Sequence, residues 1–394
     1  MAASETGATP AGACDLLAGV RVLDLSRVLA GPWATQTLAD YGAEVIKIER
    51  PGQGDDTRGW GPPWSTPAQE DQPRDSAYYL CANRGKRSVA VDIASPEGAE
   101  RMREWARSAD VLVENYKVGQ LARYGLDYDS LKAINPGLVY CAITGYGQTG
   151  PDAQRPGYDF AIQAAGGLMS ITGEPGREPQ KVGVAVVDLM TGTYATGAIL
   201  AALLRRQRTG QGAYIDCALL DVQIAMLANQ ASNHLIGGTV PTRLGNAHPN
   251  IVPYQALATQ DGHMVVAVGN DSQFRAFAAQ LGLAHLADDP HYARNADRVA
   301  HREALIPLLQ APLLARTTAD WVMRLDAAGV PCSPIHDVQQ ALAQPQVQAR
   351  GLVVERVKHG TTLRLVGHPV VIDGQRPAAA LPPPDLGEAQ GVLN

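Results

Sequence analysis

The feature that most constrains the fold is a regular alternation of short apolar runs and helical segments in the first half of the chain. The first runs, Val20–Leu25, Glu44–Ile48 and Ser88–Asp92, have the length of β-strands. A helical segment at Ala30–Leu38 follows the first run, and another at Pro96–Ser108 follows the third. Parallel strands must be joined by long crossovers, usually helices. The alternation therefore predicts an α/β fold with a parallel, doubly wound, Rossmann-like sheet.

The same alternation predicts the rest of this sheet. Further strands are expected at Val111–Glu114, Leu138–Thr144 and Ala213–Cys217. Helices are expected between them, at Leu121–Ile134 and from Leu189 to Arg208. Rossmann-like folds carry many unrelated activities, so the pattern predicts a class of fold and leaves the function open.

The pattern changes near residue 222, which predicts a second, smaller α+β domain over residues 222–334. A helical segment at Val222–Leu235 comes first, and a hairpin is expected at residues 252–269. Within the hairpin, the Asp261-Gly262 dipeptide strongly favours a tight turn between two strands.

Short strands return near the end of the chain, at Gly351–Val357 and Thr361–Val366. We therefore expect the large Rossmann-like domain to combine residues 17–221 with residues 335–394. Residues 1–16 lack the basic start and the apolar stretch of a secretory signal, and we expect them to form a disordered tail.

Composition and residue spacing exclude several classes of function. The formal net charge is -6, whereas nucleic-acid-binding proteins usually carry a basic domain or stripe, so no nucleic-acid partner is expected. No apolar run reaches the roughly 18 residues of a membrane span, so no membrane association is expected. The five cysteines are scattered and the nine histidines show no ligand spacing. These features favour reduced thiols in a cytoplasmic protein and argue against a metal site.

A glycine-rich segment, Gly145–Gly150 (GYGQTG), follows one of the expected strands and has the spacing of a dinucleotide-binding loop. Such a loop must open a helix whose N-terminus holds the pyrophosphate. Here Pro151 and Asp152 follow, and no helical apolar pattern begins. The segment therefore argues against a nicotinamide-dependent oxidoreductase. A glycine-rich loop at this point still belongs to the region where ligands bind, beyond the carboxyl ends of parallel strands.

Several motifs occur in order along nearly the whole chain and carry a resemblance to a known family. They are LAGVRVLDLSRVLAGP (17–32), AEVIKIERPGQGDDTRG (43–59), NRGKRSVAVDI (83–93), VENY (113–116), TGYGQTGP (144–151), GYDFAIQAAGG (157–167) and VGVAVVDLMTG (182–192). Together they resemble the class III coenzyme A transferases of the CaiB/BaiF type. The resemblance implies a large Rossmann-like domain with a smaller one, an interlocked homodimer, and coenzyme A (CoA) esters as substrates in place of a permanently bound cofactor.

The resemblance implies that Asp188 is a catalytic nucleophile. Asp188 precedes the expected long helix, whose dipole and free amides favour an ionised carboxylate. An ionised carboxylate needs no general base to attack a thioester. The product is a mixed anhydride, which the departing CoA thiolate converts to an aspartyl-CoA thioester. Local spacing alone favours a different role for Asp188, that of a plain helix N-cap.

The resemblance also implies a set of contacts to CoA. Arg50 and Arg123 would hold phosphates, and Asn115 and Tyr158 the pantetheine or adenine side. From the residues alone, both arginines also fit solvated surface charges. One position departs from the family pattern, because Pro156 stands where some relatives have a lysine. The implied contact residues are Leu29, Ala30, Arg50, Val91, Asn115, Tyr116, Lys117, Arg123 and Tyr158.

Two further segments resemble family regions near the acyl group. Arg58 and Trp60 lie in one of them, where an arginine can hold the free carboxylate of a dicarboxylate by a bidentate fork. Gly245, Asn246 and His248 resemble a mobile glycine-containing loop beside the nucleophile. Both segments also fit ordinary surface loops.

The resulting expectation is an enzyme that moves CoA from an acyl-CoA, with succinyl-CoA as donor, to a dicarboxylate such as glutarate. Transferases with other acceptors (formate, oxalate or carnitine) remain alternatives, and so does a non-catalytic CoA-binding protein. A racemase acting on α-methylacyl-CoA is a further alternative. It lacks support because Tyr158 stands where the resemblance to racemases requires a histidine base.

Overall fold

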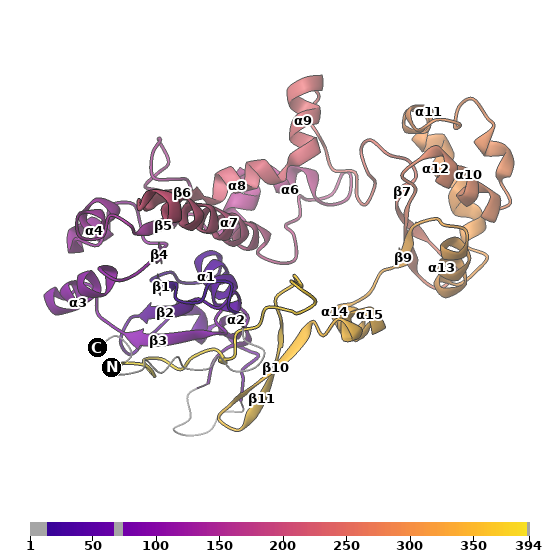
Figure 1. Ribbon diagram of the computed structural model, residues 1–394. Helices are drawn as coiled ribbons and strands as arrows, with labels where there is room; N and C mark the ends of the chain where they lie inside the picture. The colour runs from indigo at the N-terminus through magenta and orange to yellow at the C-terminus, as the bar shows by residue number, and fades with distance from the viewer. Residues whose placement is uncertain (1–13, 67–73, 392–394) are drawn as a thin grey trace. The chain divides into compact units, whose positions relative to one another are not determined.

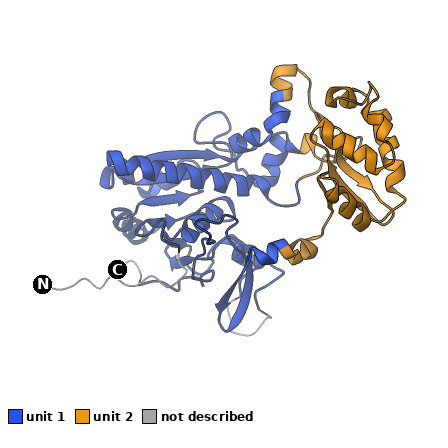
Figure 2. Cartoon of the chain, turned by 45° about the vertical axis from the view of Figure 1, so that its right-hand side comes forward, with its two compact units in different colours: residues 1–168, 182–232, 346–394 blue, residues 169–181, 233–345 orange. Residues whose placement is uncertain are grey.

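The structure, a computed structural model, describes residues 14–66 and 74–391 (Figure 1). The expected tail, residues 1–16, lies almost entirely outside them. The chain divides into two compact units (Figure 2). Unit 1 comprises residues 1–168, 182–232 and 346–394, and unit 2 comprises residues 169–181 and 233–345.

The borders between the units differ from those expected at residues 222 and 334. The observed borders fall mostly inside helices, namely α6 (Leu168–Ile171), α9 (Ala228–Gly237) and α15 (Pro345–Ala349). Sequence periodicity marks where one type of element replaces another. A compact unit is defined by contacts in three dimensions, and a border between two units need not coincide with a change in the local sequence pattern.

Unit 1 is built around a six-stranded parallel sheet with the order β3-β2-β1-β4-β5-β6. This is the doubly wound order, in which the chain changes direction between β1 and β4. The expected α/β fold with a parallel sheet is confirmed. The strands are β1 (Arg21–Asp24), β2 (Glu44–Glu49), β3 (Lys86–Ala90), β4 (Val111–Glu114), β5 (Val139–Thr144) and β6 (Ala213–Ala218).

Two of the expected helices are interrupted. The segment 121–134 is a 3-10 turn followed by a short helix, because Gly125 between them has a φ of 64°. The segment 222–235 is divided at Ala228, which has a φ of 44°. The helices and turns of unit 1, apart from those at its borders, are α1 (Ala30–Asp40), η1 (Asp56–Gly59), α2 (Ala77–Leu80), α3 (Pro96–Ala106), η2 (Leu121–Tyr124), α4 (Tyr128–Ile134), α5 (Asp159–Ala165), α7 (Val186–Thr209) and α8 (Leu219–Met226).

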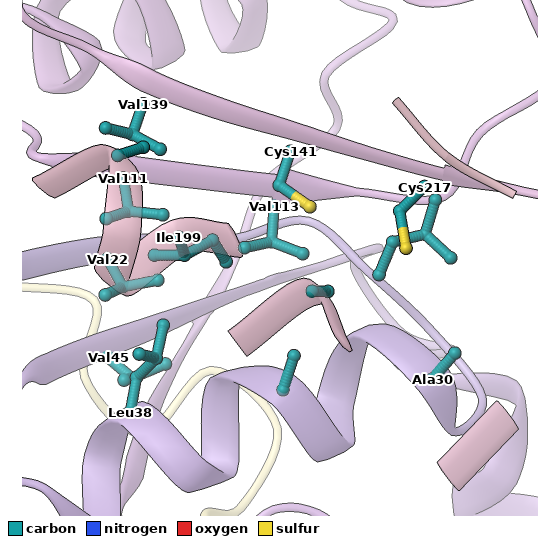
Figure 3. Packing of buried hydrophobic residues seen from close by; sticks show 14 of the residues in the cluster. Val22, Ala30, Leu38, Val45, Val111, Val113, Val139, Cys141, Ile199 and Cys217 are labelled. Carbon is teal, nitrogen blue, oxygen red and sulfur yellow. The ribbon is translucent and has the colours of Figure 1, made fainter. Parts of the chain in front are cut away.

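Both faces of the parallel sheet are buried. On one face Val22, Val111 and Val139 belong to a cluster with Leu38 of α1 and Ile199 of α7 (Figure 3). The alternate strand residues belong to a second cluster with α3 and α4. Burial on both faces explains why the central strands are mostly apolar, and buried charges such as Lys47 and Asp24 are held in ion pairs.

Helix α7 packs closely on α1. A Cβ atom added to Gly192 would lie 2.6 Å from the carbonyl oxygen of Ala30, so only glycine fits this contact. Among the described residues, α7 is the one helix long and apolar enough to cross a membrane. Its residues Val187 and Ile199 are fully buried in the core cluster, as expected for the central helix of a globular unit.

The end of the chain returns to unit 1. A hairpin of β10 (Val353–Lys358) and β11 (Thr361–Val366) is followed by an extended segment. The amide of Ala389 donates to the carbonyl oxygen of Ser88 at 2.9 Å, and the amide of Gly387 donates to the Ser88 hydroxyl at 3.0 Å. The segment therefore covers the edge of the sheet at β3, where unpaired backbone groups would otherwise be exposed.

Unit 2 contains a small antiparallel sheet covered by helices. The expected turn at Asp261-Gly262 lies between β7 and β8, whose last residue pair is Ala258 and His263. One apolar cluster joins the sheet to α10, α12 and α13. The elements are β7 (Tyr254–Ala258), β8 (His263–Ala267), α10 (Asp271–Gln280), η3 (Ala284–Ala287), α11 (Asn295–Ala300), α12 (Arg302–Leu313), α13 (Thr318–Ala327), β9 (Cys332–Pro334) and α14 (Val338–Ala343).

A buried arginine connects the parts of unit 2. The Arg298 side chain donates to the carbonyl oxygens of Val252 at 2.7 Å and Tyr292 at 2.9 Å, and to Asp271 at 2.8 Å. Replacing Arg298 by Met should destabilise unit 2 by about 3 kcal/mol, because several buried acceptors lose their donors. Hydrogen exchange of unit 2 peptides measures this loss. Arg294→Met, at an exposed position on the same segment, is the control and should change exchange little.

Candidate active site

A cleft of about 640 Å³ opens in unit 1 at the carboxyl ends of the parallel strands. The segments that line it follow β1, β2, β3, β4 and β5, and include residues 27–30, 48–50, 91–94, 115–118 and 153–158. The cleft therefore lies at the switch point of the sheet, where doubly wound folds bind their ligands. Its volume is in the range of small-molecule and cofactor sites.

The cleft brings together most of the residues implied by the family resemblance. These are Leu29, Ala30, Arg50, Val91, Asn115, Tyr116, Lys117, Tyr158 and Asp188. The glycine-rich loop after β5 also contributes, through Gly145 and residues 153–158. No helix begins directly after its glycines, and α5 starts only at Asp159. The loop therefore lacks the helix N-terminus of a dinucleotide site.

Three implied residues in unit 1 lie outside the lining formed by the described residues. Arg123 is exposed on η2. Trp60 is exposed, and its ring packs edge-on against Tyr78 with a centroid distance of 5.2 Å. The third residue is Arg58.

Arg58 belongs to a buried network of ion pairs. Its guanidinium donates to both carboxylate oxygens of Glu49 at 2.9 and 2.7 Å, to Asp75 at 2.7 Å and to the Tyr79 hydroxyl at 2.6 Å. The expectation that Arg58 holds an acceptor carboxylate is therefore corrected. Its donors already bind the protein's own acidic groups, and a substrate carboxylate would have to displace them.

Gly245, Asn246 and His248 belong to unit 2. Within that unit the amide of Gly245 donates to the carbonyl oxygen of Gly173 at 3.1 Å. The His248 ring packs against Tyr254 with a centroid distance of 5.2 Å. A role for this loop beside Asp188 stays a prediction.

Asp188 lies in the first turn of α7 and lines the cleft. The helix begins at Val186, so Asp188 is not its N-cap, and that alternative is wrong. Burial first, and the charge of Asp159 second, raise the pKa of Asp188 to about 7. The expectation that the helix N-terminus favours the ionised carboxylate is therefore corrected as well, since Asp159 accepts hydrogen bonds from the nearby amides.

This pKa predicts the pH dependence of any reaction that Asp188 begins as a nucleophile. kcat/KM should rise with pH, about tenfold per unit below a midpoint near 7, because only the ionised carboxylate attacks. Steady-state rates between pH 5 and 9 measure it, with circular dichroism at each pH to exclude unfolding. A midpoint near 4 would contradict the raised pKa.

The turn after β1 has a strained backbone. Val28 has a φ of 72°, a left-handed conformation that β-branched residues rarely adopt. Asn115 holds the preceding residue on both sides, because its side chain accepts from the Arg27 amide at 3.0 Å and donates to the Arg27 carbonyl oxygen at 2.7 Å. The Val28 amide donates to Asp55 at 3.3 Å. Such strain is often found at ligand sites.

A buried ion pair helps to hold this turn in place. Lys47 Nζ lies 2.9 Å from Asp55 Oδ2, and both side chains are completely buried. Lys47 also donates to the carbonyl oxygen of Ser26 at 2.9 Å. Burial alone raises the pKa of Asp55, but Lys47 outweighs it and lowers the pKa below its usual value. A lysine inside the apolar run EVIKIE was the one sequence signal for this pair.

Sequence reasoning missed two cations and a tyrosine near the cleft. Arg27 and Arg155 join Arg50 and Lys117 in its lining. Tyr78 on α2 has a pKa raised to about 12 by burial first and by the charge of Asp188 second, so its hydroxyl stays protonated. Arg27 stands in the turn after β1, and Arg155 in the longer glycine-rich segment between β5 and α5, which is the signal that was available.

The site therefore combines a doubly wound sheet, a cleft lined by several cations and a partly buried carboxylate in that cleft. Comparison with known proteins identifies the class of protein that has these features. The sequence matches the family model described as CoA-transferase family III over residues 17–390. The chain belongs to this family.

Individual relatives show which members of the family the chain is similar to. The chain is 50% identical over 378 residues to the succinate–glutarate CoA-transferase of Agrobacterium fabrum, which covers 96% of this chain and 94% of the relative. It is 46% identical over 374 residues to the succinyl-CoA:glutarate CoA-transferase of Homo sapiens, covering 94% and 84%. A solved structure of a CaiB/BaiF family protein from Brucella suis has a TM-score of 0.83 and 47% identity, covering 95% and 97%.

Proposed function

We propose that this enzyme transfers CoA from succinyl-CoA to a dicarboxylate such as glutarate, with Asp188 as the nucleophile. The names of the two relatives above support the donor and the acceptor. The observation that carries the proposal is the Asp188 carboxylate in a cleft at the strand ends, where no described group donates a hydrogen bond to it.

The proposed reaction consists of four acyl exchanges. The Asp188 carboxylate attacks the thioester carbonyl of succinyl-CoA, the C–S bond breaks, and a mixed anhydride forms as CoA thiolate leaves. The thiolate attacks the aspartyl carbonyl and releases succinate. The acceptor carboxylate then attacks the aspartyl-CoA thioester, the C–S bond breaks, and a second mixed anhydride forms as CoA thiolate leaves again. The thiolate attacks the acyl carbon of the acceptor in this anhydride, which gives the new acyl-CoA and frees the Asp188 carboxylate. Each exchange replaces one activated acyl bond by another, so no permanently bound cofactor is needed.

The cations of the cleft support CoA as the ligand, because its phosphates need positive partners in an acidic protein. Arg27, Arg50, Lys117 and Arg155 all line the cleft.

The contribution of these cations to CoA binding can be tested at Arg155. Replacing Arg155 by Gln should raise the KM for the acyl-CoA about fivefold, leave kcat nearly unchanged and weaken the salt dependence of KM, because one charge-assisted contact is lost. Steady-state kinetics at two ionic strengths measure all three. Arg208→Gln, exposed at the end of α7 and outside the cleft lining, is the matched control. Equal KM values for the unmodified enzyme and the Arg155 variant would contradict a contact with CoA.

The function itself is tested by incubating the enzyme with succinyl-CoA and a panel of carboxylates, with new CoA esters identified by mass spectrometry. We expect glutaryl-CoA and free succinate. Transfer only to monocarboxylates such as formate would overturn the acceptor class. Exchange of the α-proton in deuterated buffer, without transfer, would favour the racemase alternative.

We propose further that two chains form the interlocked homodimer of the family, in the cytoplasm. Large apolar side chains are exposed in α7, α8 and α9, which supports burial against a second copy. All five cysteines are free, which fits a reducing compartment. Light scattering tests the dimer, and a stable folded monomer would refute it. The exposed side chains include Tyr194, Leu204, Ile224, Leu235 and Ile236.

A further inference from the structure

The backbone amides at the N-terminus of α7 donate hydrogen bonds to acceptors that lie outside the helix. The first four amides of a helix have no acceptor within it. In α7 the amides of Val187 and Asp188 both donate to one oxygen, Asp159 Oδ1, at 2.8 and 3.3 Å. The amides on either side, of Val186 and Leu189, donate to backbone carbonyl oxygens. All four donors are therefore occupied, two of them by a carboxylate from α5.

The other oxygen of this carboxylate is held just as firmly. Asp159 Oδ2 accepts from Gln163 Nε2 at 2.6 Å, and Gln163 Oε1 accepts from the Val182 amide at 2.9 Å. Asp159 and Gln163 lie one turn apart on α5, and both are buried. Helix α5 thus anchors both ends of the segment 182–188, which carries the nucleophile.

The Asp188 carboxylate has no such partner. Among residues 14–66 and 74–391, no group donates a hydrogen bond to it. An acidic side chain in the first turn ordinarily interacts with the free amides of its own helix. Here Asp159 occupies those amides, and Asp188 lines the cleft instead.

We propose that Asp159 is a positioning residue for the transfer reaction, because it occupies the first amides of α7 and leaves the Asp188 carboxylate free to attack the acyl carbon. The inference rests on the proposed function. It assigns a role to a residue that touches neither the substrate nor the reacting atoms.

The charge of Asp159 has a second effect. It adds to burial in raising the pKa of Asp188, and nucleophilic strength rises with pKa, as it does for thiolates. Within the described part of the chain, Asp159 is the one group whose charge raises this pKa. The charge of Asp188 also acts on Tyr78 of α2. The other titratable or charged groups that line the cleft with Asp188 are Arg27, Glu49, Arg50, Asp55, Asp56, Asp92, Tyr116, Lys117, Tyr124, Arg155 and Tyr158.

The first variant is Asp159→Asn, which removes the charge and places the new amide nitrogen against Gln163 Nε2, so that two donors face each other and the hold on the α7 amides is weakened. We expect the midpoint of the pH profile of kcat/KM to fall by at least about one unit and kcat to fall about tenfold. A merely structural role would lower the amount of folded enzyme and leave the midpoint near 7. That result would overturn the inference.

A second variant combines Asp159→Asn with Gln163→Glu. The new amide at position 159 can donate to the new carboxylate at position 163, which still accepts from the Val182 amide. Every hydrogen bond is retained, and the negative charge moves by one turn of α5. We expect kcat to recover to within about threefold of the unmodified enzyme and the midpoint to return toward 7. A double variant no better than Asp159→Asn would contradict the proposal.

A measurement without acyl substrate separates this inference from the proposed function. Carbodiimide reacts with the protonated carboxyl, so labelling of Asp188 against pH, quantified by peptide mass spectrometry, follows its titration directly. We expect a midpoint near 7 in the unmodified protein and a lower one in Asp159→Asn. Equal midpoints overturn the inference whether or not the enzyme moves CoA. A shifted midpoint in a protein that transfers no CoA would instead refute the proposed function.

Discussion

Replacing Asp188 by Asn is expected to lower kcat for CoA transfer by at least about 10⁴-fold, as the loss of a covalent nucleophile does in other enzymes. The amide has nearly the size of the carboxyl group but cannot form an anhydride with an acyl group. No described residue donates to the carboxylate, so the replacement breaks no hydrogen bond. The Kd for the acyl-CoA should therefore change by less than about threefold.

Rapid-quench mass spectrometry provides the direct measurement, because the unmodified enzyme should gain the mass of an acyl group or of CoA and the variant should not. Asp221→Asn is the matched control, since Asp221 is an exposed aspartate in the first turn of α8. The control should transfer CoA at the normal rate. Transfer by the Asp188 variant within tenfold of that rate would exclude Asp188 as the nucleophile.

The same replacement has a consequence for stability. The pKa of Asp188 is about 7 in the folded protein against a usual 3.8, so folding is opposed once the unfolded chain loses this proton. The penalty is absent below pH 4, grows between pH 4 and 7, and is complete above pH 7. Asp188→Asn removes it. The variant should therefore be more stable than the unmodified protein at pH 8, by about 2 kcal/mol for a partly exposed group, and equal to it near pH 4.

Replacing Lys47 by Met is expected to destabilise unit 1 by about 3–5 kcal/mol at pH 8, because it leaves a completely buried carboxylate without its counter-ion. The pKa of Asp55, which Lys47 now lowers, would rise through burial alone. In the variant Asp55 can therefore fold in its neutral form at low pH, and the deficit should shrink toward pH 5. Urea unfolding at both pH values measures the difference.

Two further variants make this test specific. Lys132→Met removes an exposed lysine of α4 and should change stability by less than about 0.5 kcal/mol. Lys47→Met combined with Asp55→Asn removes both charges and should recover part of the loss at pH 8. A Lys47 variant as stable as the unmodified protein would show that the pair is dispensable. A higher KM for acyl-CoA is also expected, because Asp55 holds the Val28 amide in the cleft.

Much of unit 1 could be predicted because its determinants are local. The strand at Val111–Glu114 was predicted at its observed limits, and the other strands within a few residues. Period and run length distinguish strand from helix without knowledge of contacts. Cleft residues such as Arg50 and Lys117 were indicated by the resemblance to a known family, and their position agrees with the rule that segments after parallel strands meet at one edge of the sheet.

By itself, therefore, the sequence determined the class of fold and the order of the strands along the chain, and its resemblance to a known family indicated Asp188 as the candidate nucleophile. The tertiary structure decided which groups surround those residues. Asp159 reaches the Asp188 amide across 29 positions, and Arg58 reaches the carbonyl oxygen of Pro384 across 326. A pKa or an ion pair depends on distance in space and on loss of water, and spacing along the chain records neither. This is why the candidate nucleophile could be named from the sequence, whereas its raised pKa and the ion pairs that occupy Arg58 could not be predicted.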